Sequence, residues 1–230
     1  MKAILMSIRP EHVANILNKI KTLEIRKRFP SDYVGWVYIY ATKGNKEERL
    51  IADLQPDKVY HPLTEALHRG VYSIVDEDLI WNDCKKNILN GKVVARFWCD
   101  KVEEIKWHKD TAIDLDYYKV VNVIENEEIL KASCLQLKEL ENYLQIKNAK
   151  NIPLDWGITF NLGKAIHITE LEIFDKPKEI SEFIPYCELC GSTSCCNCKH
   201  AQRDSELKFI CCDKIKSLTR APQSWQFIEV

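Results

Sequence analysis

Hydrophobic and polar residues alternate along much of this chain with the period of a β-strand, and two stretches have the period of an amphipathic helix. Apolar residues recur at helical spacing after Pro10 and predict a helix over 10–19. The second stretch, 126–147, has acidic residues at its start and lysines at its end, as the helix dipole favours. Short apolar or alternating runs predict strands at 3–7, 22–28, 35–42, 91–105, 156–162, 165–174 and 223–230.

This order of elements, with several strands and few helices, predicts an α+β protein built on a closed or nearly closed β-barrel. We expect the barrel within residues 1–180, interrupted by helical excursions at about 43–90 and 108–150. A cysteine-rich module at 181–219 then precedes a closing strand of the barrel at 220–230.

The composition is that of an ordinary globular protein. The 230 residues are 46% hydrophobic and 29% charged, and no apolar run reaches the ~18 residues that span a membrane. The apolar stretch at the start is too short for a signal peptide, so we expect a cytoplasmic location. A net charge of −1 argues against a protein that binds nucleic acid through its overall charge alone. The first 50 residues, however, hold 10 Lys and Arg against 5 Asp and Glu, so this part of the chain is basic.

The densest group of charges is the run from Lys19 to Arg28, where five of ten residues are basic and one is acidic. At strand spacing one face carries four polar side chains, with Lys21 at its entrance: Thr22, Glu24, Arg26 and Arg28. Guanidinium groups suit phosphate or base edges, and a carboxylate among them can orient them, accept a hydrogen bond from a base or transfer a proton. The alternative interpretation is a solvated edge strand with alternating charges.

A third predicted strand, 35–42, carries aromatic residues on one face: Trp36, Tyr38 and Tyr40. Aromatic rings on a strand can stack unpaired bases. Packing in the core or at the barrel rim is the alternative for at least two of them.

The string Lys-Thr-x-Glu-x-Arg at 21–26, between a helix and a Gly-aromatic strand, resembles the ASCH domain of the PUA-like superfamily. The family string has Gly two residues before the Lys, where this chain has Lys19. Gly91–Val94 resembles a further strand of the family, and the Pro-Gln-Ser-Trp run at 222–225 is similar to the ending of ASCH proteins encoded by phages and prophages. Together these pieces touch about 1–42, 91–105 and 156–230.

The resemblance implies a small β-barrel whose cleft, beside the first helix, binds RNA or a modified nucleoside. The expected binding residues are Lys21, Thr22, Glu24, Arg26, Arg28 and Tyr40. Some relatives resemble amidohydrolases that deacetylate cytidine, and others resemble nucleases. The amidohydrolase nucleophile is a Thr three residues after the Lys, a position that Glu24 occupies here. An enzyme would use Lys21 and Glu24 to handle protons, or Thr22 with an adjacent base. A phage-encoded protein-interaction or anti-defence factor is the third hypothesis.

Seven of the ten cysteines fall between Cys187 and Cys212, and disulfides are not expected in the cytosol. Two Cys-x2-Cys pairs supply the four thiolates of a structural zinc site: Cys187, Cys190, Cys195 and Cys198. Cys211, Cys212 and His200 are alternative ligands, and a second site or a redox role stays open. The three scattered cysteines are predicted to be buried: Cys84, Cys99 and Cys134.

Overall fold

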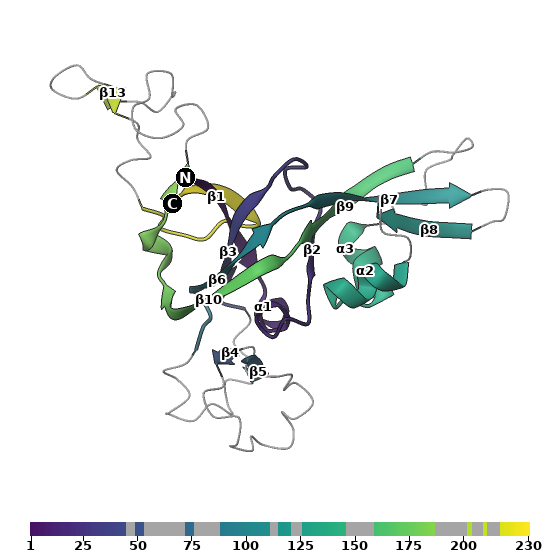
Figure 1. Cartoon of the computed structure of the whole chain (residues 1–230), viewed down its shortest axis with the longest axis horizontal. Coiled ribbons are helices and arrows are strands. Elements are labelled where there is room, and N and C mark those ends of the chain that lie inside the picture. The colour runs from purple at the N-terminus through teal and green to yellow at the C-terminus, as the bar shows by residue number, and fades with distance from the viewer. Residues whose placement is uncertain are drawn as a thin grey trace. The chain divides into compact units, whose positions relative to one another are not determined.

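In the computed structural model (Figure 1), the chain folds into two compact units. Unit 1 comprises Met1–Leu17, Trp36–Phe97 and Leu171–Val230, and unit 2 comprises Asn18–Gly35 and Trp98–Glu170. The structure describes residues 1–44, 49–52, 72–75, 88–110, 115–120, 126–145, 159–186, 202–203, 209–210 and 217–230.

Unit 1 is organised around a six-stranded sheet with the order β10-β6-β3-β1-β14-β11. Its strands are β1 (Lys2–Ile8), β3 (Gly35–Ala41), β6 (Val93–Cys99), β10 (Thr169–Lys178), β11 (Ile184–Pro185) and β14 (Trp225–Glu229). Strand β1 is parallel to β3 and antiparallel to β14, with Leu5 opposite Tyr38 and Ala3 opposite Ile228. The sequence from Ala3 to Ile8 is almost continuously apolar because this central strand is buried along its whole length.

One face of this sheet carries an aromatic and aliphatic core. Leu5, Tyr38, Tyr40 and Ile228 project from the strands and pack with Phe183, which follows a 3₁₀ turn at Ile180–Glu182. The packing interpretation is therefore confirmed for both tyrosines, which are 5% and 7% exposed. Burying such rings is the largest apolar contribution that a residue can make to a core.

Helix α1 (Pro10–Leu17) is shorter than the predicted 10–19 and has one buried stripe. It packs against β4 (Arg49–Ala52) and β5 (Tyr72–Val75), which pair antiparallel. Within the stretch 43–90, where the sequence predicted a partly helical excursion, the structure describes the strands 49–52 and 72–75. Most of the other residues lie outside the description, so the excursion stays a prediction.

Unit 2 is a four-stranded antiparallel sheet with the order β2-β9-β7-β8. Its strands are β2 (Leu23–Arg26), β9 (Thr159–His167), β7 (Val102–Asp110) and β8 (Leu115–Val120). The core combines Leu23, Ile25, Ile105 and Ala165 of the sheet with apolar residues of α2 (Asn126–Ser133) and α3 (Leu137–Leu144). The single helix predicted over 126–147 is two helices, because Cys134 between them has a left-handed backbone with φ of 54°.

The α+β class is confirmed, and the closed barrel is wrong. Both sheets are open in the described residues, with β10 and β11 at the edges of one and β2 and β8 at the edges of the other. The predicted strand over 91–105 is two strands, β6 and β7, and each belongs to a different sheet. The chain therefore passes from one sheet to the other between Cys99 and Val102, so its strands are divided between two open sheets.

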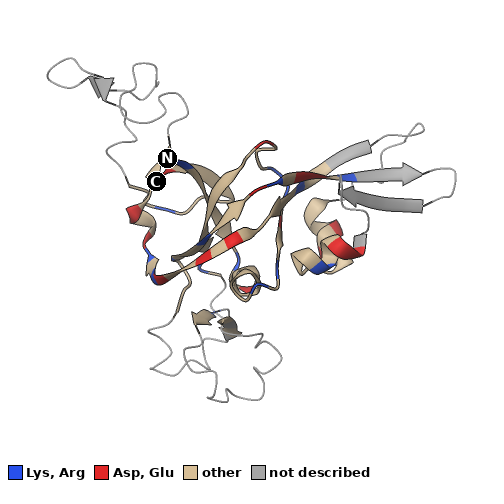
Figure 2. Ribbon diagram, in the orientation of Figure 1, with Lys and Arg blue, Asp and Glu red and all other residues tan. Residues whose placement is uncertain are grey.

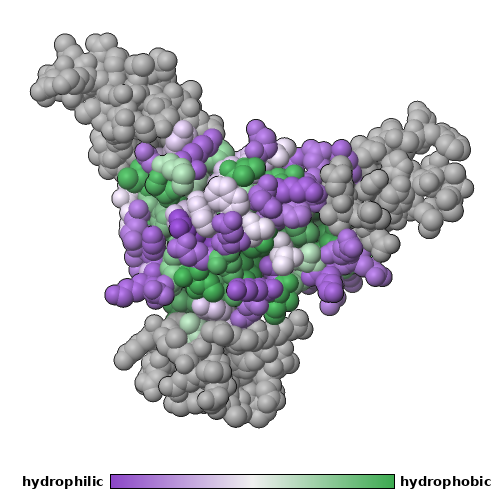
Figure 3. Space-filling model, viewed as in Figure 1, coloured by the Kyte–Doolittle hydropathy of each residue, from purple (hydrophilic) through white to green (hydrophobic). Residues whose placement is uncertain are grey.

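Charged positions of both signs are spread over the described residues (Figure 2). Hydrophilic side chains cover much of the face seen in Figure 3, with smaller apolar patches between them. No helix among the described residues is long and apolar enough to cross a membrane.

Candidate functional site

The approach to β2 depends on the backbone of Lys19. This residue has φ of 59°, the left-handed conformation that glycine adopts without strain. It follows α1 at the position where the ASCH string has glycine, and left-handed residues commonly end helices there. The lysine therefore keeps the turn that glycine would make, although its Cβ atom adds a steric cost.

Lys21 is held against the end of α2. Its side chain is 2% exposed, and its ammonium donates a hydrogen bond to the carbonyl oxygen of Ser133 at 2.6 Å. The neighbouring Thr22 amide donates to the carbonyl of Ala132 at 2.8 Å. The last carbonyls of a helix lack intrahelical partners and carry its negative dipole end, so both contacts stabilise α2. Lys21 thus has a structural role in unit 2.

Glu24 lies between two cations below the surface. Its carboxylate is 3.3 Å from Lys21 Nζ and 3.1 Å from Arg26 Nη2. The side chain of Glu24 is 5% exposed and that of Arg26 is 13% exposed. The alternation is as predicted, because Leu23 and Ile25 point into the core of unit 2. β2 is indeed an edge strand, but its carboxylate is buried, so the solvated-strand interpretation does not describe it.

The charges continue across the sheet from β2 to β7. Arg26 is the register partner of Lys164 on β9, and Lys164 is the partner of Glu104 on β7. Register partners share a face of the sheet. Lys164 Nζ donates to Glu104 Oε1 at 2.7 Å and to the hydroxyl of Ser31 at 2.8 Å. Lys106 Nζ lies 3.1 Å from the other oxygen of Glu104.

We call these six residues the charged cluster: Lys21, Glu24, Arg26, Glu104, Lys106 and Lys164. It has four cations and two carboxylates, so cations are in excess. Hydrogen bonds from Lys164 and Lys106 hold the pKa of Glu104 below its ordinary value, which keeps this carboxylate ionised.

Close packing fixes the backbone beside Arg26. A Cβ atom on Gly163 would lie 2.9 Å from the carbonyl oxygen of Arg26 and 2.9 Å from Leu144. Only glycine therefore lets β9 approach β2 and α3 so closely.

The expected binding residues divide by location. Lys21, Glu24 and Arg26 come together, and Thr22 and Arg28 are exposed beside them in sequence. Tyr40 belongs to unit 1, where burial and the charge of Glu179 raise the pKa of its hydroxyl. The three members from β7 and β9 were missed, because only the strand register brings these distant residues to Arg26.

A second buried carboxylate lies on the opposite face of the same sheet. Glu103 is 2% exposed, is ion-paired with Lys101, and has an oxygen 3.1 Å from His167 Nε2. Its register partner is the core residue Ala165. This arrangement fixes the ring of His167 at the end of β9.

The predicted zinc ligands lie outside the described residues: Cys187, Cys190, Cys195, Cys198, His200, Cys211 and Cys212. The structural zinc site stays a prediction. No cluster of potential metal ligands occurs among the residues that the structure describes. Cys99 is buried, as predicted, and burial raises the pKa of its thiol to about 12, so the thiol stays protonated and unreactive. Cys134 is half-buried, and Cys84 is not among the described residues.

No protein-family model matches the chain, and no curated protein shows significant similarity to it.

Proposed function

We propose that this protein binds RNA or a nucleoside through the charged cluster of unit 2. The supporting observation is the pairing of a buried carboxylate with two cations at the sheet edge, where Arg26 retains partial exposure. Burying charge is costly, and cationic groups in excess of carboxylates favour an anionic or hydrogen-bonding partner. Exposed Arg28 and Thr22 extend the polar surface along the chain.

The members of the cluster have different parts in this proposal. Glu24 orients the guanidinium of Arg26 toward a phosphate or a base edge of the ligand. Lys21 neutralises Glu24 and caps α2, so it positions the site. The resemblance to the ASCH domain supports these roles, and a PUA-like arrangement is part of the proposal.

Binding is favoured over catalysis by the contacts of Lys21. The ammonium of Lys21 donates to the carbonyl of Ser133 and contacts Glu24. Because these two side chains are buried against each other, neither is positioned to exchange a proton with a substrate. A screen with acetylated nucleosides and labelled RNA tests this choice. Turnover that disappears in Glu24→Gln, under conditions where circular dichroism shows this variant to be folded, would assign an enzyme instead.

The direct test is filter binding of a short single-stranded RNA at two salt concentrations. We expect Arg26→Ala and Arg28→Ala each to weaken binding and to lower the salt slope by about 1 per lost phosphate contact. Lys138→Ala is the matched control, because Lys138 is an exposed cation on α3 in the same unit. Thermal unfolding of each variant separates a lost contact from a lost fold.

The proposal is overturned if Arg26→Ala and Arg28→Ala bind RNA and nucleosides as tightly as the unaltered protein does. It is also overturned if Lys138→Ala weakens binding to the same extent, since the effect would then reflect general charge.

A further inference from the structure

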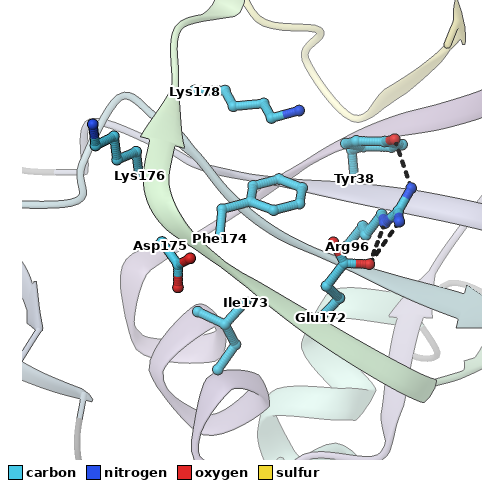
Figure 4. Close-up of a pocket in the computed structure, with 8 residues that line it drawn as sticks. All are labelled: Tyr38, Arg96, Glu172, Ile173, Phe174, Asp175, Lys176 and Lys178. Carbon is cyan, nitrogen blue, oxygen red and sulfur yellow. Dashed lines mark hydrogen bonds and ion pairs between the residues drawn. The ribbon is translucent and has the colours of Figure 1, made fainter.

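A separate groove opens in unit 1 beside β10. It encloses about 370 Å³, within the range of ~300–1,000 Å³ typical of small-molecule sites. Its principal walls are Tyr38 of β3, Arg96 of β6, and Glu172, Phe174 and Lys178 of β10 (Figure 4). We call it the β10 groove.

Arg96 is fixed in one orientation. Its guanidinium carbon lies 4.2 Å from the centre of the Trp36 ring, which provides a stacking surface. Nε donates to Glu172 Oε2 at 2.8 Å, Nη2 lies 2.6 Å from the same oxygen, and Nη1 donates to the Tyr38 hydroxyl at 3.2 Å. These contacts use three of the five guanidinium hydrogens. Burial lowers the pKa of Arg96, but hydrogen bonds to Glu172 and Tyr38 raise it overall.

A second cation lies over the aromatic part of the groove. Lys178 Nζ is 4.8 Å from the centre of the Phe174 ring, a distance at which the ring face attracts an ammonium. Figure 4 shows the Lys178 side chain extending on the same side of β10 as Phe174 and Tyr38, while Lys176 points away. Arg96 and Lys178 thus border the same aromatic pair.

The aromatic pair has one accessible member. Tyr38 is 5% exposed and packs between Phe174, 6.0 Å away, and Phe183, 5.4 Å away. Phe174 is half-buried on the edge strand, so part of its ring faces the groove. A planar group can pack against Phe174 while an anion reaches the two cations.

We propose that the β10 groove binds a nucleotide, with its phosphate between Arg96 and Lys178 and its base against Phe174. The lining has three cations and two carboxylates, and one of these carboxylates, Glu172, is already paired with Arg96. The nucleotide is either a free mononucleotide or one unit of a single strand, since both offer a phosphate and a base. This site does not depend on the charged cluster, because every residue in it belongs to unit 1.

Calorimetric titration at low salt tests the proposal with four probes: adenosine monophosphate, adenosine, inorganic phosphate and a short single-stranded RNA. Lys178→Met retains the apolar stem over Phe174 and removes the charge, and Arg96→Lys retains the charge but loses the fork. We expect each variant to weaken nucleotide binding by about tenfold, as for loss of one charge-assisted hydrogen bond. Lys138→Met is the matched control and should bind like the unaltered protein.

Binding of the mononucleotide well above adenosine and phosphate supports a free-nucleotide site, provided that Lys178→Met weakens it. Binding of the RNA alone, with the same sensitivity, supports a strand site. Three results overturn the proposal: no binding of either the mononucleotide or the RNA, equal binding of phosphate and mononucleotide, or binding that Arg26→Ala abolishes and Lys178→Met leaves unchanged. The last result would assign the nucleotide to the charged cluster, so the two proposals fail separately.

Discussion

The two units use the same pair of residue types in opposite environments. In unit 2, Arg26 lies 3.1 Å from a Glu24 side chain that is 5% exposed. In unit 1, Arg96 lies 2.6 Å from a Glu172 side chain that is 49% exposed. The two ion pairs have similar distances, so what distinguishes them is their exposure to solvent. Water screens the pair in unit 1, whereas the pair in unit 2 has lost most of its hydration and depends on its protein partners.

This difference separates stability from binding. Removing one partner of a buried pair leaves a charge that nothing hydrates, so the charged cluster cannot lose Glu24 without a cost to the fold. Arg96 can exchange part of its hydration for a ligand, because it remains partly exposed and is oriented by Trp36. The two sites therefore call for different variants, with Arg26 and Arg28 tested for binding in one and Lys178 in the other.

The largest effect that this comparison predicts is on stability. Glu24→Gln should reduce the free energy of unfolding by about 3–5 kcal/mol, because Lys21 and Arg26 lose their buried counter-charge. The matched change in unit 1, Glu172→Gln, should cost about 0–1 kcal/mol, as for an exposed pair. Urea unfolding followed by circular dichroism measures both. Equal losses in the two variants would show that burial does not distinguish these ion pairs.

The part of the charged cluster that could be predicted is the part that is local in sequence. Alternation along 21–28 places Glu24 and Arg26 on one face and Leu23 and Ile25 on the other, as the structure has them. The burial of Glu24 was not predictable from this run, because it depends on contacts from outside it, such as the carbonyl of Ser133 that holds Lys21.

The remaining features depend on pairings across long sequence separations. Neither Arg26 beside Lys164 nor Arg96 beside Trp36 can be read from spacing, since strand order and register decide both. Barrel closure failed as a prediction for the same reason. Periodicity identifies strands, but it does not say which edges meet.

A smaller effect concerns the turn that leads into each site. Lys19 has φ of 59°, whereas the turn before β6 has Gly91 with φ of 79°. Lys19→Gly should raise the free energy of unfolding by about 1 kcal/mol, because it removes the strain of a Cβ atom in the left-handed region. Gly91→Ala should lower it by a similar amount for the converse reason. Chemical denaturation measures both, and a destabilised Lys19→Gly variant would mean that the Lys19 side chain makes a contact worth more than the strain.

The smallest predicted effect is a pH dependence in the exposed part of the charged cluster. Lys164 and Lys106 lower the pKa of Glu104 in the folded protein, and the unfolded value is about 4.3. The stabilisation is therefore fully present above that value and is lost as the pH falls through the folded pKa. Glu104 is 35% exposed, so screening limits the effect to about 0.2–1 kcal/mol. We expect Glu104→Gln to be less stable than the unaltered protein at neutral pH and to approach it in acid. A stability difference that is constant from neutral to acid pH would contradict this assignment. Glu104 would then contribute through packing, whereas Glu24 contributes through its charge.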